Sequence, residues 1–440
     1  MSTVVYRVTQ LLSSLAEPLP IGTNLGLFHL LWMVVSGRLL ESRGAVIPGL
    51  AALGLEPPAV RRAWAALAHG HWETARLVTA WEQRVQQEGR WQPRQHGGYR
   101  PVACDLIGFF RPRLQDCPTT HYRADAGQAR PAIPVGIAAR VGAVGEQRLA
   151  LPCLLLRADP ADPRETVLQQ RLLAATGARL AAADVLVCDA GFPLAQVLAA
   201  GVPRFLVRGA KNCTARRAYL PEYPGKGRPA THGEVVRPLA RTYRGREIAA
   251  TPPDRQETWQ EEGRILNAHF WDQLVGSDGK PGDPTFTVIV IHDPRYSEPL
   301  LLLTNVAISG AVALALYHDR WPIEQPPLVA KQLLGGHRQY VFAPESRQRL
   351  PELTLLAGSL LTYAAATSPA LPSGFWDRRP RPTAGRLRRA LARVELTALG
   401  PLPARIREKA SPTAHLPKGV AGHRRRKRLP PTAHPLPLAA

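Results

Sequence analysis

Two aspartates lie within or directly after strongly apolar segments, where a charged side chain is energetically unfavourable unless it has a partner. Asp105 lies inside the apolar run 102–107, and Asp189 follows the apolar run 185–188. A carboxylate buried in a strand costs several kcal/mol unless it is paired or bound to a metal. An acid at the carboxyl end of a strand also projects where open α/β sheets bind their ligands. An ion pair with a nearby arginine, or a turn-capping role, would explain either aspartate alone equally well.

A third segment carries a more informative pattern. Tyr317, Arg320, Glu324 and Lys331 follow one another at spacings of 3, 4 and 7 residues, which predicts one stripe along a helix. A stripe of one acid, two cations and a phenol is unsuited to core packing, but it suits binding of a metal and a phosphate backbone. The alternative is a solvated amphipathic face with an Arg320–Glu324 ion pair.

These residues carry a resemblance to a known family. The string Tyr-x2-Arg-x3-Glu-x6-Lys resembles the Y-R-E-K signature of the DDE transposases of bacterial insertion sequences. Arg-Trp-Pro-Ile-Glu at 320–324 is similar to that family's RWxIE core, and Asp-Ala-Gly-Phe at 189–192 is similar to its second acidic motif. The order also fits, with 84 residues from Asp105 to Asp189 and 135 from there to Glu324. The resemblance covers about residues 100–365.

The resemblance implies an RNase H-like catalytic core in which Asp105, Asp189 and Glu324 form the metal-binding catalytic triad. Tyr317 and two neighbouring cations, Arg320 and Lys331, would grip phosphates near the scissile position. Such sites use two divalent ions roughly 4 Å apart for in-line displacement at phosphorus. Oxygen-only ligands suit Mg²⁺ or Mn²⁺. Hydrolysis would first free a 3′-hydroxyl at the end of the element, and that hydroxyl would then attack target DNA.

The chain departs from the family pattern at two places. Family members often have Thr or Ser two residues after the first aspartate, where this chain has Ile107. Pro326 and Pro327 fall just after Glu324, where the helix should continue. Because proline is tolerated only in the first turn of a helix, we expect the helix to restart near Pro322 or to kink. A kink would change the alignment of the lysine in the motif with the glutamate.

Four other aspartates compete less well for a catalytic role. Asp116 and Asp125 follow the first strand but lie in turn-like sequence, and Asp159 and Asp162 occupy a proline-rich loop where aspartate commonly forms turns.

Several cationic and aromatic residues are further candidates for contact with DNA. Arg208 and Lys211 follow the strand after Asp189 and could reach DNA, although solvated charges explain them equally well. Trp259 or Trp271 could stack on a flipped base, as in relatives of this subgroup. We favour buried core tryptophans for both.

The charge of the chain points to a polyanionic partner. Lys and Arg total 56 against 34 Asp and Glu, a formal charge of +22. Residues 377–440 hold 16 Lys/Arg and 3 Asp/Glu, so this segment alone carries +13. Its Arg388-Arg389 and Arg424-Arg425-Arg426 clusters lack apolar periodicity, which predicts contacts to phosphates and not to bases. A solubilising surface or a dimer contact is the alternative.

The remaining composition bounds the compartment and partners. An apolar content of 45% over 440 residues allows real cores, and the start lacks a secretory pattern. The apolar runs 25–35 and 353–366 are too short to span a bilayer. Five cysteines without a CxxC pair predict reduced thiols and no zinc site. We therefore expect a cytoplasmic, nucleoid-associated protein that contacts no membrane and forms a homodimer when two DNA ends are paired.

The hydropathy pattern predicts an α/β chain with a mixed central sheet flanked by helices. Predicted strands are 102–110, 132–144, 149–157, 184–189, 204–208, 286–292 and 300–303, and predicted helices include 24–40, one opening at Pro57, 165–180, 194–198, and 306–320 capped by Thr304 or Asn305. The domains we expect are a helical DNA-end-binding domain at 1–95, the two parts of the catalytic core at 96–211 and 286–376, an inserted β-rich subdomain at 212–285, and a basic, partly disordered tail at 377–440.

The sequence thus favours a transposase that binds the ends of a mobile element, cuts them and joins the freed 3′-hydroxyl to target DNA. Two alternatives remain. One is a DNA-binding derivative of such an enzyme that no longer cuts, and the other is an RNase H-like DNA nuclease that needs no end-binding domain.

Overall fold

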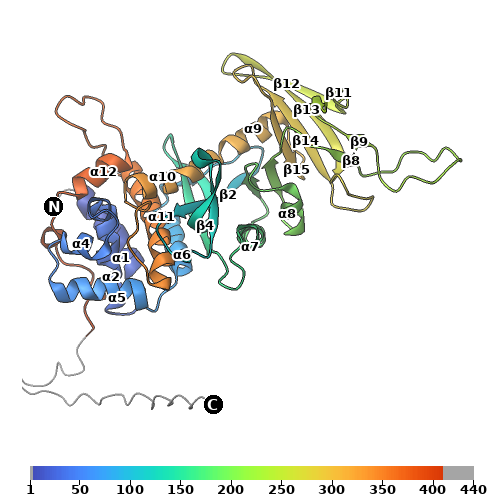
Figure 1. Cartoon of the computed structure of the whole chain (residues 1–440). Coiled ribbons are helices and arrows are strands. Elements are labelled where there is room, and N and C mark those ends of the chain that lie inside the picture. Colours follow the sequence, from blue (N-terminus) through green and yellow to red (C-terminus); the bar gives the residue numbers. More distant parts are fainter. Residues whose placement is uncertain (1–2, 410–440) are drawn as a thin grey trace, which may run out of the picture.

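The N-terminal part of the chain is helical, as predicted. The computed structural model describes residues 3–409 of the chain (Figure 1). Its first helices are α1 (Thr3–Ala16), α2 (Thr23–Val35), α3 (Arg38–Glu41), α4 (Val46–Ala51), α5 (Pro57–His69) and α6 (Thr74–Glu88). Prolines occupy the first turn of α5, where their missing N–H and fixed φ are compatible with a helix.

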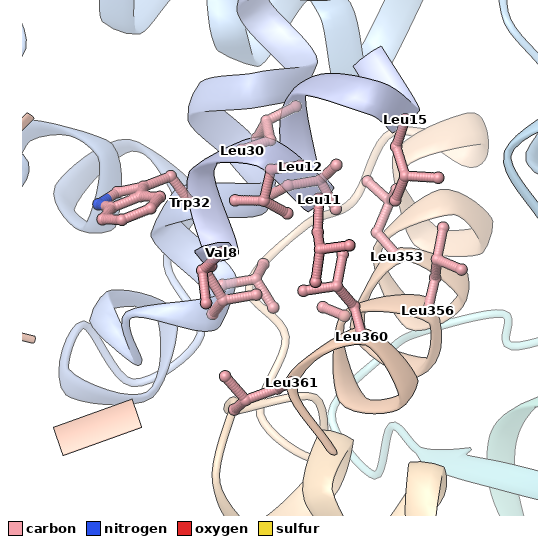
Figure 2. Packing of buried hydrophobic residues seen from close by; sticks show 14 of the residues in the cluster. Val8, Leu11, Leu12, Leu15, Leu30, Trp32, Leu353, Leu356, Leu360 and Leu361 are labelled. Atoms are coloured by element: carbon pink, nitrogen blue, oxygen red, sulfur yellow. The ribbon is translucent and has the colours of Figure 1, made fainter. Parts of the chain in front are cut away.

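These helices pack around a long, almost entirely buried helix, α11 (Pro344–Ala366). Apolar residues recur every three to four positions on α1 and place Val8, Leu11 and Leu15 on one face. Figure 2 shows this face against Leu353 and Leu360 of α11. The core of the helical region therefore joins the N-terminal helices to a helix more than 300 residues later in the sequence, and α11 also contacts strands of the sheet.

The centre of the molecule is a mixed sheet flanked by helices, so the predicted α/β class is confirmed. Five of its strands run in the order β5–β4–β2–β6–β7. Strand β2 is antiparallel to β4 and parallel to β6, which is parallel to β7. Their bounds are β2 (Arg100–Phe110), β4 (Gln128–Val144), β5 (Gln147–Arg157), β6 (Asp184–Cys188) and β7 (Phe205–Arg208), each close to the predicted segment.

Small elements complete this part of the chain. The connections hold β1 (Gln92–Pro93), β3 (Thr120–Arg123), η1 (Ala124–Ala126), α7 (Glu165–Gly177) and α8 (Leu194–Ala199). Alternate residues of a strand face opposite sides of a sheet. Cys104 and Leu186 accordingly pack with Leu172 of α7 on one side, while Ala103 and Val187 belong to the clusters on the other side.

The sheet continues beyond β7 into a β-rich extension, at the right of Figure 1. Its strands are β8 (Ala215–Arg217), β9 (Val235–Val236), β10 (Arg241–Tyr243), β11 (Arg246–Ile248), β12 (Arg255–Glu261), β13 (Arg264–Val275), β14 (Phe286–His292) and β15 (Leu300–Thr304). Strand β15 pairs with β7 and β14 pairs with β13. The segment 212–285 thus joins the central sheet edge to edge through β13–β15.

The segment with the Y-R-E-K spacing is a broken helix and not one stripe. It comprises α9 (Gly310–His318), the 3-10 turn η2 (Trp321–Glu324) and α10 (Gln325–Gln332). Pro322 occupies the first turn of η2, and Pro326 and Pro327 occupy the first turn of α10, so the predicted restart near Pro322 is confirmed. The prediction that Tyr317 and Lys331 share one regular helix with the two motif residues between them is wrong.

The predicted start of this helix is also wrong. The N-cap of α9 is Ser309, whose Oγ accepts a hydrogen bond from the backbone N–H of Val312 at 3.3 Å. Thr304 is instead the last residue of β15, and its Oγ1 donates to the carbonyl of Phe205 at 2.6 Å. Asn305 Oδ1 accepts from the Phe205 N–H at 2.9 Å. Both predicted caps therefore bond to β7 instead of capping the helix.

Part of the predicted basic tail is folded onto the helical region. Residues 384–391 form α12 (Ala384–Leu391), and residues 396–399 form the turn η3 (Leu396–Leu399). Leu387 and Leu391 are buried in the same cluster as α1 and α2, so the expected lack of apolar periodicity around Arg388 and Arg389 is wrong. The Arg424–Arg426 cluster lies outside the described residues. Within residues 3–409, no helix has the length and apolar character needed to cross a membrane.

Candidate active site

The strand register brings the two aspartates together. Strands β2 and β6 are parallel, with Ala103 opposite Val187. Two residues further along each strand, Asp105 therefore faces Asp189, just past the end of β6. The period of two places both acids on the same side of the sheet as Ala103 and Val187. The pairing of two apolar strands thus positions two carboxylates on one face of the sheet, where β6 ends.

The broken helix covers this same side of the sheet. Ile323 of η2 and Ala330 of α10 belong to the cluster that holds Ala103 and Ile107. Leu316 of α9 belongs to the neighbouring cluster with Val187. The helical segment that carries the motif is therefore anchored by its apolar residues over β2 and β6. Its polar residues Arg320, Glu324 and Lys331 lie near enough to Asp105 for their charges to interact.

The charges of Asp189 and Glu324 both act on Asp105. Burial, and next the negative charge of Asp189, raise the pKa of Asp105 to about 6, and Glu324 acts in the same direction. Arg320 and the backbone N–H of Leu106, which donates to Asp105 Oδ1 at 2.8 Å, oppose this rise. The three carboxylates predicted from the motif therefore lie near enough for Asp105 to interact with the charges of the other two.

Arg320 lies among these carboxylates. Its Nη2 donates to Glu324 Oε1 at 2.7 Å. Burial alone would lower the pKa of Arg320, but the charge of Asp189, the hydrogen bond to Glu324 and the charge of Asp105 together raise it. The largely buried guanidinium of Arg320 therefore neutralises part of the negative charge of the three nearby carboxylates.

Lys331 is placed near Asp105 despite the break in the helix. Its Nζ lies 5.5 Å from the centre of the Phe109 ring, and burial lowers its pKa while Asp105 opposes that effect. Asp189 is held by a local turn in which its Oδ1 accepts from the Gly191 N–H at 2.9 Å. Ile107, the departure from the family pattern, is buried among the apolar residues beneath the helix.

Asp319 fixes the break in the helix. Its side chain is only 1% exposed. It accepts from Arg94 Nε at 2.9 Å, from His96 Nε2 at 2.7 Å and from Arg148 Nη1 at 3.3 Å. Burial alone would raise the pKa of Asp319, but the hydrogen bonds from His96 and Arg94 outweigh it and lower the pKa. Asp319, the residue just before Arg320, is thus bound to the segment before β2 and to the start of β5.

A groove of about 1000 Å³ opens beside Glu324, and neither Asp105 nor Asp189 is among the residues that line it. Tyr317, Arg320 and Glu324 line it on one side, and the loop between β14 and β15 lines it on the other. Three further arginines line its walls, namely Arg148, Arg208 and Arg295, together with the aromatic residues Tyr296 and Trp321. Both aromatic residues are exposed.

Of these three arginines, only Arg208 was a candidate from the sequence. Arg208 is exposed at the end of β7 and has no ion-pair partner among residues 3–409. Arg295 is held by Asp293, to which its Nη2 donates at 2.8 Å, and its guanidinium lies 5.5 Å from the Tyr296 ring centre. The Asp-Pro-Arg-Tyr turn between two apolar strands was the available signal for Arg295. Arg148 carried none, because only the fold brings its hairpin to the groove.

The other candidates lie outside this cluster or in the core. Lys211 forms an ion pair with Glu298, at the rim of the groove. Trp271 is fully buried and its Nε1 donates to the Thr251 carbonyl at 3.0 Å, which excludes stacking on a base. Trp259 packs against Gly310 at the start of α9.

The competing aspartates and the paired arginines of the tail are also accounted for. Asp125 and Asp162 each pair with an arginine two residues away, and Asp159 pairs with Arg171 at 3.7 Å. Asp116 sits in a left-handed turn with φ of 53°. Arg388 lies against Gly37, whereas Arg389 is exposed.

The donor set is compatible with hard divalent cations. Three carboxylates supply only oxygen ligands, and their mutual repulsion would be relieved by a bound cation. In the present arrangement, however, no group of three or more His, Cys, Asp or Glu side chains within residues 3–409 is already disposed to hold a metal ion. Arg320 already donates a hydrogen bond to the carboxylate of Glu324. A cation at this site would therefore share that carboxylate with the guanidinium or displace the guanidinium.

No protein-family model matches the chain, and no curated protein matches it. The function therefore has to be inferred from the site itself.

Proposed function

We propose that the chain is a DDE-type transposase that cuts the ends of a mobile DNA element and joins them to target DNA. One observation carries the proposal: Asp105 and Asp189, adjacent through strand register, face Arg320 and Glu324 of the broken helix beside an arginine-lined groove. In this proposal the sheet β5–β4–β2–β6–β7 is the RNase H-like core.

Each residue of the cluster has a role in the proposed reaction. Asp105, Asp189 and Glu324 would hold two divalent ions, Mg²⁺ or Mn²⁺. When bound, the ions supply activation of the attacking oxygen and stabilisation of the leaving oxygen. Arg320 and Lys331 would bind the phosphate next to the scissile bond. Lys331 is partly dehydrated and has no ion-pair partner within residues 3–409, so it gains by contacting an anion, whereas Arg320 would exchange part of its contact with Glu324 for the phosphate.

The groove would hold the DNA backbone that leads into the site. Arg148, Arg208 and Arg295 reach it from three separate strand ends. Guanidinium groups bind phosphate in a bidentate manner and carry no information about base sequence. The proposed groove contacts therefore orient the duplex, while recognition of the element's ends falls to other surfaces. Pairing of two ends by two copies of the chain belongs to the same proposal.

A DNA-binding derivative without cutting activity is the second candidate. The ion pair between Arg320 and Glu324 favours it, because that carboxylate is already neutralised. A nuclease that acts without regard to DNA ends is the third.

A supercoiled plasmid that carries the coding sequence with its flanking DNA separates the three candidates. With Mg²⁺, the transposase excises the element, the derivative only shifts the plasmid in a gel, and the nuclease cuts at unrelated positions. The variant Asp189→Asn should abolish cutting and leave DNA binding intact. Asp125→Asn, an exposed aspartate outside the site, is the matched control. Equal loss of cutting and binding in Asp189→Asn would show that this residue has a structural role instead.

A further inference from the structure

The loop between α11 and α12, residues 368–383, exposes an aromatic pair. Phe375 is 97% exposed and Trp376 is 68% exposed. Their ring centres lie 5.0 Å apart in an edge-to-face arrangement. In Figure 1 this loop extends away from the helical region next to α12. Two adjacent large aromatic side chains in water are unfavourable for an isolated protein, so the pair indicates a contact surface.

The base of the loop is held in one conformation. The side chain of Asp377 accepts hydrogen bonds at 2.9 Å from both the N–H and the hydroxyl of Ser373. Arg386 of α12 forms an ion pair with Asp377 at 2.8 Å and donates to the Leu371 carbonyl at 3.0 Å. Trp376 folds over Gly374, where an added Cβ would approach the indole to 2.5 Å. The aromatic pair is therefore presented by an ordered turn.

The charge of the loop selects the partner. Arg378, Arg379 and Arg381 are exposed, and none of them has an ion-pair partner within the described part of the chain. Asp377 is the single acid of residues 368–383, and its carboxylate is turned inward to Arg386. Three free guanidinium groups next to two aromatic rings match a polyanion that also offers flat apolar faces.

We infer that this loop is a DNA-binding wedge. Phe375 and Trp376 insert at a base step of duplex DNA, and Arg378, Arg379 and Arg381 bind phosphates beside it. Apolar side chains that enter a base step unstack it and kink the duplex. A lipid surface fits less well, because these two are the only exposed large hydrophobic residues among residues 368–383. The inference rests on the proposed function in one respect, that the chain acts on DNA.

Two variants of the full chain test the wedge in the absence of divalent metal. One replaces the rings (Phe375→Ala with Trp376→Ala), and the other replaces the charges (Arg378→Gln, Arg379→Gln and Arg381→Gln). Tyr340→Ala with Phe342→Ala removes two exposed rings elsewhere and is the matched control. Binding of a labelled duplex is measured by fluorescence anisotropy at several salt concentrations. Bending is measured by energy transfer between the duplex ends.

The two variants should differ in what they lose. Loss of the rings should weaken binding about tenfold, remove the bend and leave the salt dependence unchanged, because no phosphate contact is lost. Loss of the charges should flatten the log–log salt dependence by about 0.9 for each phosphate contact, or up to about 2.7. Thermal unfolding should be unchanged in both variants, since the replaced side chains are exposed.

Three outcomes would overturn the wedge. The first is unchanged DNA binding and bending in both variants. The second is a defect confined to self-association in sedimentation, which would assign the loop to a second copy of the chain. The third is a defect confined to binding of phosphatidylserine vesicles.

Failure of the wedge and failure of the proposed function are distinguishable. Metal-dependent cutting with unaffected binding overturns only the wedge, whereas ring-dependent bending without any cutting overturns only the transposase.

Discussion

Arg320 donates to Glu324 at 2.7 Å and at the same time neutralises part of the charge of the two aspartates on the sheet. The ion pair sits at the break in the motif helix, where a regular helix is interrupted by η2. A single guanidinium thus compensates three acids whose proximity is unfavourable. This arrangement makes the stability of the site and its affinity for cations depend on one residue.

Replacing Arg320 with Gln should lower cutting by about 10²–10³-fold, because a preorganised charge near the reacting phosphate is lost. It should also lower thermal stability without metal, since the carboxylates then repel one another. Mg²⁺ should stabilise this variant more than the wild-type chain. Thermal unfolding with and without Mg²⁺ measures the effect, and Arg320→Lys should restore part of it. Equal stabilisation of both proteins by Mg²⁺ would contradict this account.

Replacing Asp105 with Asn should stabilise the fold at pH 7.5 while it abolishes cutting. Burial raises the pKa of this carboxyl from its usual 3.8 to about 6. Above that pH the carboxyl is charged in the folded chain, and its burial lowers the free energy of unfolding. The difference between these two pKa values limits the gain in the free energy of unfolding to about 3 kcal/mol, and we expect a gain of about 1–2 kcal/mol. The gain should disappear as the pH falls from 6 to below 4, because the wild-type carboxyl is then protonated in both states. Chemical denaturation at several pH values measures it.

Asp184→Asn is the matched control for that experiment. This aspartate is also buried, but Arg100 and Arg140 donate to it at 3.0 and 2.7 Å. Burial alone would raise the pKa of Asp184, and the hydrogen bond from Arg140 with the other donors lowers it instead. Its replacement should therefore destabilise the fold at pH 7.5, by about 3 kcal/mol or more. Destabilisation by Asp105→Asn to the same extent would show that Asp105 is a structural residue.

Asp319→Asn should impair cutting more than DNA binding. The carboxylate accepts from Arg94, His96 and Arg148, and an amide oxygen cannot hold all three donors. We expect cutting to fall about tenfold as Arg320 loses its fixed position, with a stability loss of about 2 kcal/mol.

The pKa of Asp319 is lowered in the fold, so its contribution to stability is present above its unfolded pKa and is lost as the pH falls through the folded value. Unfolding of wild type and variant should thus converge in acid, and an unchanged difference would refute the ion-pair account.

Much of the sheet could be predicted because local patterns determine it. Apolar runs of the right length predicted β2, β4 and β6, and the alternation of their residues places Asp105 and Asp189 on one face. The parallel register that makes these acids neighbours was not readable from the chain. It depends on which strands pair, and that choice is made by the packing of helices on both sides of the sheet.

The errors have different physical causes, and one of them is tertiary competition for polar groups. Thr304 and Asn305 have the right chemistry for a helix cap, but β7 offers them backbone partners and Ser309 caps α9 instead. Similarly, Leu387 and Leu391 are spaced for one helical face, which the surrounding arginines and prolines obscured. The groove was unpredictable in detail because Arg148 and Arg295 are brought to it by hairpins far apart in the sequence.

Arg208 offers the clearest test of the groove, because no folded contact depends on its charge. It is exposed at the end of β7 and without an ion-pair partner in residues 3–409. Arg208→Gln should leave thermal unfolding unchanged, weaken duplex binding, and flatten the log–log salt dependence by about 0.9, the value for one phosphate contact. Arg171→Gln, on α7 at the opposite side of the sheet, is the control for position and should leave the salt dependence of binding unchanged. Anisotropy titrations at four salt concentrations measure both variants. If Arg208→Gln and Arg171→Gln give the same slope as wild type, DNA does not enter this groove, and phosphate contacts must come from other arginines of the chain.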